Sequence, residues 1–238
     1  MKQLEILLET DELVAINKPA GMLSIPDREQ SEPSLKDHLL QRYGSIYTVH
    51  RLDKETSGVI VFAKNEASHR FLSQQFESRT TEKFYNGLVL GKVYDEEGII
   101  DEPIGEHPAK KGMMTVVRKG KPSVTAFRCL ESFALYSWME FKILTGRTHQ
   151  IRVHMKHYGH PIVCDPLYGD GKPVLLSSFK KKFKLGKDVL EEKPLLNRLA
   201  LHARELSFSD TRGRAIVLEA PLPKDLRATL QQLEKVSV

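Results

Sequence analysis

Cysteine is nearly absent from this chain, which has two among its 238 residues, Cys129 and Cys164. Two cysteines exclude a disulfide-stapled scaffold, and a reducing, cytoplasmic environment is the default for such a chain. Long apolar runs are absent as well, because none approaches the roughly 20 residues that cross a bilayer. The first 21 residues carry acids within their apolar stretch, unlike a secretory or transit peptide. We therefore expect a cytoplasmic protein with no membrane partner.

Motifs for cofactors are also missing. The sequence has neither a Walker loop nor the glycine-rich fingerprint of dinucleotide-binding folds, so we expect no nucleotide cofactor. No cysteine pair stands at the spacing of a zinc site. Four histidines at spacings of five, three and three residues fall on different helix faces with no acidic ligand nearby. Packing or RNA-facing roles therefore suit these residues better than metal binding: His149, His154, His157 and His160.

Cations exceed acids only slightly, with 36 Lys and Arg against 31 Asp and Glu and a formal net charge of +5. This excess permits nucleic-acid binding without demanding it. The cations gather in two clusters. The first lies within residues 107–122, which contain no acid, and consists of Lys110, Lys111, Arg118, Lys119 and Lys121; the second consists of Lys180, Lys181, Lys182, Lys184 and Lys187. Both clusters are either solvated loops or patches that contact RNA phosphates with salt-sensitive affinity.

No clear linker divides the chain, and we expect a single domain over residues 1–238. Such a length can bury a sizeable core without metals or disulfides. Alternating or continuous apolar residues predict strands over 13–16, 59–63, 85–90, 124–130, 135–144 and 216–218. Helices are expected to begin at Ser34, after Asn65, at Thr148 and after Pro223. Residues 170–195 are rich in lysine and weakly patterned, and we expect an insertion there. The connections are too short for repeated crossover helices, which predicts an α+β fold with a mixed or mostly antiparallel sheet.

The densest run of ionisable residues, 50–58, immediately precedes the strand expected over 59–63. A loop that leads into a rigid buried strand is well placed to hold reactive side chains, although an exposed charged turn would have the same composition. The run is not a kinase catalytic loop, because Leu52 interrupts the His-Arg-Asp order and no Asp-Phe-Gly follows. Ser57 lies in Thr-Ser-Gly and not in a Gly-x-Ser-x-Gly elbow, which disfavours a serine hydrolase.

Two further segments are candidates for RNA contact. Residues 145–154 span a strand-to-helix junction, where unpaired helix amides and the fixed charges of Arg147 and Arg152 favour an anion. Tyr85 stands at the start of a predicted strand. A tyrosine there is usually a core residue, but its ring can also stack on a base.

Taken in order, these segments resemble the RluA-type pseudouridine synthase family. The shared motifs are Asn-Lys-Pro-Ala-Gly at 17–21, His-Arg-Leu-Asp at 50–53, Thr-Ser-Gly at 56–58, Lys-x-Tyr at 83–85, Thr-Gly-Arg-Thr-His-Gln-Ile-Arg-Val-His at 145–154, Gly-His-Pro-Ile at 159–162, Leu-His-Ala at 201–203 and Ala-Pro-Leu-Pro at 220–223. No single motif is decisive, but their order through most of the chain is highly specific.

The resemblance implies the pseudouridine synthase catalytic fold, with a long sheet, flanking helices and a central cleft. It also implies a reaction in which a uridine within RNA is detached at its glycosidic bond, rotated, and rejoined through C5 to C1′, with no cofactor and no metal. Asp53 would be the essential carboxylate, Arg152 would pair with it, and Tyr85 would pack on the target base.

The resemblance further implies a set of substrate-binding residues. Ile151 would line the pocket, and Arg51 would help to hold the target nucleotide out of the stack. The remaining candidates for substrate binding are His50, Arg147 and His149.

Elementary chemistry is consistent with catalysis of this isomerisation by a single carboxylate. A base cannot be isomerised inside a stack, so the nucleotide must flip out. A glycosidase needs a second carboxylate, because one group must activate water or protonate the leaving group. An isomerase that keeps its base in the pocket needs no water. An arginine near Asp53 would keep that carboxylate ionised. Whether Asp53 attacks the sugar or abstracts a proton is left open.

The sequence also departs from the family's pattern. Many relatives carry a small RNA-binding domain before the catalytic one, and here the first motif begins too early to leave room for it. We therefore expect the catalytic domain to find its RNA alone, and the resemblance to short family members implies tRNA or large-subunit rRNA as that RNA. The sequence does not determine the oligomeric state, for which we favour a monomer. Cys164 stands where glycine is common before Asp165. The alternative function is a catalytically inactive RNA-binding module on the same fold, which the presence of Asp53, Tyr85 and Arg152 disfavours.

Overall fold

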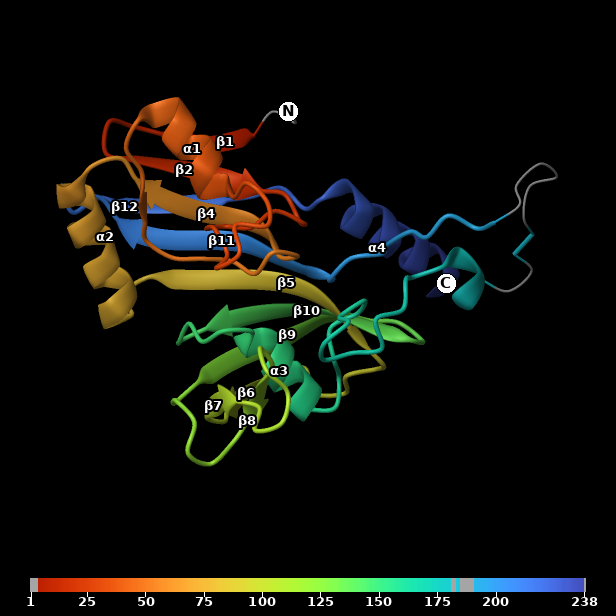
Figure 1. Ribbon diagram of the computed structural model, residues 1–238. Coiled ribbons are helices and arrows are strands. Elements are labelled where there is room, and N and C mark those ends of the chain that lie inside the picture. The colour runs from red at the N-terminus through yellow and green to blue at the C-terminus, as the bar shows by residue number, and fades with distance from the viewer. Residues whose placement is uncertain (1–3, 181–182, 185–190, 238) are drawn as a thin grey trace. The chain divides into compact units, whose positions relative to one another are not determined.

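The structure is a computed structural model that describes residues 4–180, 183–184 and 191–237 (Figure 1). It divides into two compact units, Met1–Tyr85 with His202–Pro221 and Asn86–Leu201 with Leu222–Val238. Three members of the second lysine cluster, Lys181, Lys182 and Lys187, lie outside the described residues.

The first unit is built on a sheet in which β1, β2, β4 and β11 follow one another in that order; off this path, β12 pairs with β11 and β3 pairs with β4. Its strands are β1 (Glu5–Glu9), β2 (Leu13–Lys18), β3 (Tyr47–Thr48), β4 (Ser57–Ala63), β11 (Leu201–Ser209) and β12 (Ala215–Glu219). Neighbours are antiparallel except β4 and β11, which run parallel and pair Ser57 with His202. Every residue of β4 is buried, as the continuous apolar run predicted.

A glycine permits the close approach of β4 to β11. Gly58 has φ +117°, and a Cβ atom there would lie 2.1 Å from the carbonyl oxygen of Ala203. No side chain fits at that distance, so the start of β4 depends on glycine for both its backbone conformation and its packing. The C-terminal end of the loop that precedes β4 is therefore held in a fixed position.

Two helices cover opposite faces of this sheet. Helix α1 (Leu35–Tyr43) packs Leu35 and Leu39 on the face of Ile60, and α2 (Glu66–Ser78) packs Leu72 on the face of Val61. The predicted start of α1 is confirmed by a capping box at Ser34, and the start of α2 by the Asn65 cap.

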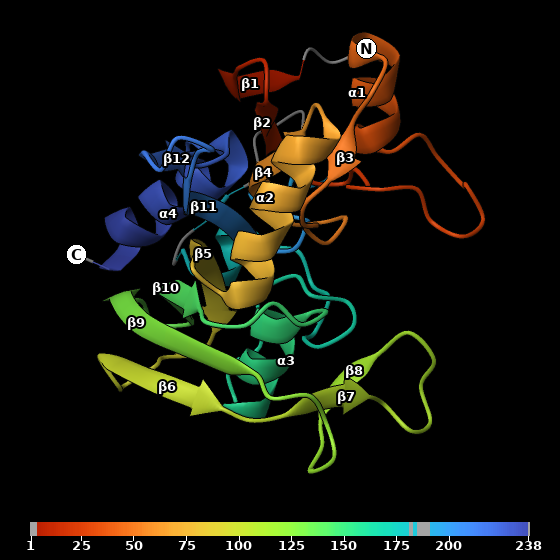
Figure 2. The same cartoon turned by 90° about the vertical axis from the view of Figure 1, so that its left-hand side faces the viewer.

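The second unit contains a sheet in the order β5–β10–β9–β6 and a separate two-stranded hairpin, β7–β8. Figure 2 shows β6 and β9 running side by side. The strands are β5 (Glu82–Leu90, of which Asn86 onward belongs to this unit), β6 (Glu97–Asp101), β7 (Ile104–Glu106), β8 (Met114–Val116), β9 (Val124–Ser132) and β10 (Tyr136–Ile143). The predicted antiparallel neighbours over 124–130 and 135–144 are confirmed as β9 and β10.

The helices of this unit are α3 (Gln150–His157) and α4 (Lys224–Ser237), with a 3-10 turn at Leu176–Ser178. Helix α3 starts two residues later than the predicted Thr148, because His149 has a left-handed φ of 55°. In α4 the predicted apolar stripe is buried, with Leu226 and Leu233 at 1% and 2% exposure.

The α+β class and the mixed, mostly antiparallel pairing are confirmed by these elements. The single domain, the central cleft and the insertion near 170–195 stay predictions. Within the described ranges, no helix combines the length and the apolar composition needed to cross a bilayer.

Candidate active site

The loop of residues 50–56 is held in a fixed shape before β4. Leu52 anchors it, 5% exposed and packed in the core beneath α1. The Oγ atom of Ser24 accepts the Leu52 N–H at 3.1 Å and donates to the Leu52 carbonyl at 2.8 Å. The Thr56 N–H donates to the Asp53 carbonyl at 3.1 Å and closes the turn. Half-buried Asp53 is thus presented by a backbone that is restrained on both sides.

A buried lysine ties this loop to the end of β2. The Lys18 side chain has no exposed surface, and its Nζ donates to three carbonyl oxygens: Pro19 at 3.1 Å, Met22 at 2.9 Å and Lys54 at 2.9 Å. Burial of an ammonium group is costly unless its protons are hydrogen-bonded. Lys18 therefore fixes the residue that directly follows Asp53.

Replacement of Lys18 by methionine is expected to lower the free energy of unfolding by about 2–4 kcal/mol, because three carbonyl oxygens lose a charged donor. Urea unfolding followed by circular dichroism measures the change. The matched control is Lys54→Met, which removes an exposed side chain paired with Glu32 and should cost no more than about 0.5 kcal/mol. Equal losses in the two variants would contradict a stabilising role for the Lys18 ammonium group.

Tyr85 lies close to Asp53 although the two residues are far apart in the sequence. Its ring packs against the core cluster that contains Leu52 and Ile60. Burial raises the pKa of the Tyr85 hydroxyl well above its ordinary value, and the charge of Asp53 raises that pKa further. The phenol therefore stays neutral, and the first unit brings an aromatic ring and a carboxylate together.

His50 and Arg51 have different surroundings. His50 Nε2 accepts the Val61 N–H at 3.1 Å, and its ring stacks on Phe76 with centroids 4.6 Å apart. Burial, followed by the charge of Lys83, lowers the pKa of His50 to about 3. A neutral His50 thus holds the start of the loop against β4, while Arg51 is exposed. Their contacts with substrate stay predictions.

Ser57 does form a hydrogen bond with a histidine, but in the interior. Its Oγ lies 2.9 Å from His202 Nδ1, and His202 Nε2 lies 3.2 Å from the Ala220 carbonyl. The carbonyl can only accept, so Nε2 carries the proton and Nδ1 accepts from the serine. Both side chains are at most 2% exposed. This pair links parallel strands and does not present a nucleophile to a substrate.

In the second unit, the side chain of Gln150 organises the approach to α3. Its Oε1 accepts from Thr145 Oγ1 at 2.6 Å and from the Arg147 N–H at 3.0 Å. The Arg147 Nε donates to the Pro122 carbonyl at 3.2 Å. Ile151, in the first turn of α3, is 4% exposed. The predicted roles of Arg147 and Ile151 toward the substrate are not tested by these contacts.

Arg152 forms a buried ion pair that the sequence did not predict. Its Nε and Nη2 donate to the two carboxylate oxygens of Asp165 at 2.7 and 2.9 Å. The Oδ1 atom of Asp165 also accepts the N–H groups of Leu167 and Tyr168 at 2.9 and 3.1 Å. Because Asp53 and Arg152 belong to different units, the predicted pairing of these two residues stays a prediction.

Tyr168 connects Arg152 to the residue that precedes α3. The centroid of its ring lies 5.0 Å from the guanidinium carbon of Arg152. Its hydroxyl accepts the Met114 N–H at 2.9 Å and lies 2.8 Å from His149 Nδ1. His149 is therefore held at the N-terminus of α3 by a hydroxyl that is itself anchored to β8.

Two of the other histidines in this group, His154 and His160, make internal hydrogen bonds, whereas His157 is exposed. His154 Nδ1 lies 2.9 Å from Thr125 Oγ1, and its Nε2 lies 2.9 Å from the Glu102 carbonyl. His160 Nδ1 lies 2.9 Å from the Leu90 carbonyl. In the described part of the chain, no group of three or more His, Cys, Asp or Glu side chains is placed to hold a metal ion.

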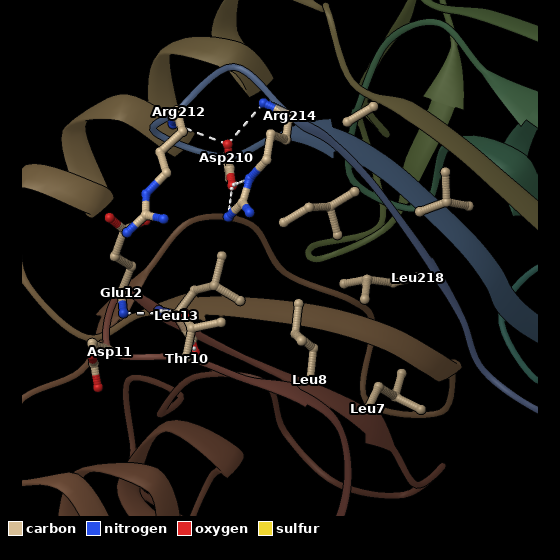
Figure 3. A pocket seen from close by; sticks show the side chains of 13 residues that line it. Leu7, Leu8, Thr10, Asp11, Glu12, Leu13, Asp210, Arg212, Arg214 and Leu218 are labelled. Atoms are coloured by element: carbon tan, nitrogen blue, oxygen red, sulfur yellow. Dashed lines mark hydrogen bonds and ion pairs between the residues drawn. The ribbon is translucent and has the colours of Figure 1, made fainter.

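The first unit contains a hollow of about 800 Å³ (Figure 3). Apolar side chains including Leu7, Leu8 and Leu218 line it, and Asp210 and Arg214 stand at the β11–β12 turn. None of the candidate site residues, all of which the structure describes, contributes to its lining. The hollow and the candidate active site therefore share no residue.

Sequence reasoning missed Lys18, Ser24, Asp165 and Tyr168 as residues that position the site. Lys18 lies inside a motif, yet nothing in that motif indicates that its ammonium group is buried. For Asp165 the available signal is its place in Cys-Asp-Pro at 164–166, a turn sequence in which an aspartate often accepts backbone N–H groups.

Comparison with known proteins gives a consistent result. A sequence profile described as RNA pseudouridylate synthase matches residues 12–157. Ribosomal large subunit pseudouridine synthase D of Nitrosomonas europaea is 37% identical over 240 residues, which are 98% of this chain but 66% of that protein. Dual-specificity RNA pseudouridine synthase RluA of Vibrio vulnificus is 39% identical over 211 residues, 86% of this chain and 77% of that protein.

A solved structure agrees in fold. Human RNA pseudouridylate synthase domain containing 4 superposes with a TM-score of 0.73 and 27% identity, covering 97% of this chain and 93% of the human chain. The family profile spans more than half of the chain and includes Asp53, Tyr85 and Arg152. The chain therefore belongs to the RNA pseudouridylate synthase family.

Proposed function

We propose that this protein isomerises uridine to pseudouridine within RNA. The observation that carries the proposal is the restrained loop that presents Asp53 beside the neutral phenol of Tyr85. In the reaction, the bond from C1′ to N1 breaks and a bond from C1′ to C5 forms. The proton on C5 leaves to solvent and N1 takes up a proton, so the base gains and loses no other atom.

Asp53 is the essential carboxylate in this proposal. It either attacks C1′ or abstracts a proton from the sugar, and the restrained turn suits both steps because both need an oxygen in one fixed position. Tyr85 offers a flat apolar face to the base. Stacking on an aromatic ring contributes about 1–3 kcal/mol per base and so offsets much of the cost of flipping the nucleotide out. Exposed Arg51 contacts the flipped nucleotide.

The substrate is RNA, and tRNA or large-subunit rRNA is the class we propose. Of the two relatives described above, one is named for the ribosomal large subunit and the other for dual specificity toward RNA. The proposed location is the cytoplasm and the proposed assembly is a monomer. Neither metal nor nucleotide cofactor enters the proposed reaction.

The first basic cluster is the described surface best suited to RNA phosphates. Its five cations are exposed, and they lie on the β7–β8 hairpin and the turn that follows it: Lys110, Lys111, Arg118, Lys119 and Lys121. The hairpin is anchored through Met113 and Ile104, which pack on Val153 of α3. A cationic surface on an anchored hairpin lowers the entropic cost of binding a phosphate backbone.

The double variant Lys110→Ala, Lys111→Ala is expected to weaken RNA affinity and to flatten its salt dependence by about 0.7–0.9 in log–log slope for each lost phosphate contact. Affinity titrations at several salt concentrations measure this slope. The control variant Arg227→Ala, Lys235→Ala removes the same charge from exposed positions on α4. Identical slopes for the two variants would show that the hairpin cations are only solvated.

Tritium release from RNA tests the proposed function directly. Transcripts of tRNA and rRNA carrying tritium at uridine C5 are incubated with the protein, and release is followed with time. We expect release from one RNA class. RNA binding without any release would overturn the isomerase and favour the inactive RNA-binding module.

A further inference from the structure

We propose that Asp165 is a positioning residue for the isomerisation, which it serves by orienting the guanidinium group of Arg152. The inference rests on the proposed function together with the pairing of Arg152 and Asp53 that the family resemblance implies. It assigns a role to Asp165 and Tyr168, which no motif-based expectation had given to either residue.

The hydrogen bonds from Arg152 fix its orientation in full. An arginine side chain has several rotatable bonds, and a single hydrogen bond would leave the guanidinium plane free to turn. Here two parallel bonds, from Nε and Nη2, meet the two oxygens of Asp165 at 2.7 and 2.9 Å. A two-point contact of this kind sets the plane and therefore the direction of Nη1.

Asp165 is itself immobilised by its turn. It has no exposed surface, and its Oδ1 accepts two backbone N–H groups in addition to Arg152. The turn begins at Cys164, whose φ of 58° is left-handed. It ends at Gly169, where a Cβ atom would lie 2.9 Å from the Ile162 carbonyl oxygen. The left-handed φ at position 164 explains why glycine would suit that position.

Tyr168 supports the same guanidinium from its face. The ring centroid lies 5.0 Å from the Arg152 guanidinium carbon, within the range of a cation–π contact. The hydroxyl of the same residue bridges the Met114 N–H and His149 Nδ1. Asp165 and Tyr168 therefore join Arg152 to the basic hairpin and to the start of α3.

Stability alone does not account for a pair buried this deeply. The side chains of Arg152 and Asp165 are 7% and 0% exposed. Taking two charges out of water costs about as much as their attraction returns, so an apolar pair of similar volume would stabilise the fold equally well. An ion pair at this position is better explained by the need to hold a cationic group at a fixed angle.

The main test is Asp165→Asn, which keeps the size of the side chain and removes its charge. The amide cannot accept at both positions, so one Arg152 N–H loses its partner. We expect kcat to fall about 10- to 100-fold, since small misplacement of an active group costs about 100-fold, with KM and RNA affinity within about threefold. A fall in RNA affinity equal to the fall in kcat would overturn the positioning role.

The matched control is Asp210→Asn. Asp210 also lies in a turn, accepts the N–H groups of Arg212 and Arg214, and pairs with the Arg214 guanidinium. It belongs to the first unit and lines the hollow of Figure 3. Its replacement should leave kcat unchanged within about twofold. If Asp210→Asn lowered kcat as much as Asp165→Asn does, the loss would follow from breaking any Asp–Arg pair in a turn and would not be specific to Arg152.

A double variant tests whether Asp165 affects the reaction through Arg152. In an Arg152→Met background, single-turnover rates with excess protein should change less than about twofold on adding Asp165→Asn, because the group to be positioned is already missing. The same 10- to 100-fold loss in that background would overturn the proposal.

The Nε–H signal of Arg152 in the ¹⁵N spectrum provides a readout that does not need activity. The signal is assigned by its absence in Arg152→Met, and it should be shifted and protected from exchange in the wild type and lost in Asp165→Asn. An unchanged signal in Asp165→Asn would overturn the positioning role. Failure of the proposed function is distinguishable, because it would appear as wild-type protein without tritium release and with the Arg152 signal intact.

Discussion

Replacement of Asp53 by asparagine should lower kcat by about 10⁴-fold and leave RNA affinity within about threefold. The side chain keeps its size, and Leu52, Ser24 and Thr56 hold the loop through backbone contacts that the change does not touch. What disappears is the negative charge and the nucleophilic or basic oxygen. Tritium release measured under single-turnover conditions gives the rate.

The control for this change is Glu55→Gln, in the same loop. It removes one negative charge close to Asp53, and we expect kcat to stay within about threefold of the wild type. If both variants lost activity equally, catalysis would depend on the total negative charge of the loop and not on the Asp53 carboxylate in particular. If Asp53→Asn kept full activity, the assignment of the essential carboxylate would be wrong.

The second large effect is expected for Arg152→Met, which should lower kcat by about 10²- to 10³-fold, the loss that follows removal of one fixed electrostatic contact in an active site. The structure adds a consequence that the sequence did not predict. Asp165 would keep a buried charge without its cationic partner, so the free energy of unfolding should fall by about 3–5 kcal/mol.

Unfolding and activity can be separated in this variant. Urea unfolding measures the loss of stability, and the rate is measured at a temperature where circular dichroism shows a folded protein. Adding Asp165→Asn should restore part of the stability, because the unpaired carboxylate is removed, while kcat stays low. Recovery of kcat together with stability would show that Arg152 has no role beyond folding.

Local signals in the sequence account for the elements that were predicted well. Ser34 and Asp37 form the capping box that starts α1, and Gly44 ends that helix with a φ of 75°. These signals act over three or four residues and need no tertiary context. The continuous apolar run of β4 was equally informative, because a strand buried on both faces shows no alternation.

Elements and contacts that depend on distant partners were missed. Strand β1 is a partly exposed edge strand and carries little pattern. The burial of Lys18 depends on the Lys54 carbonyl, which comes from another strand–loop junction. Asp165 follows α3 in the sequence, and only the fold shows that it accepts from Arg152. The motifs therefore identified candidate reactive residues, but they did not identify the side chains that position them.

The central claim is that Asp53 and Tyr85 form the site of uridine isomerisation, and nucleoside analysis of the RNA tests it most directly. RNA labelled with tritium at uridine C5 is incubated with wild-type protein or Asp53→Asn, digested, and separated by liquid chromatography with mass detection. The account predicts pseudouridine formed mole for mole with released tritium by the wild type, and neither by Asp53→Asn. Pseudouridine formation by both proteins at equal rates, or by neither on any tRNA or rRNA that the wild type binds, would contradict it.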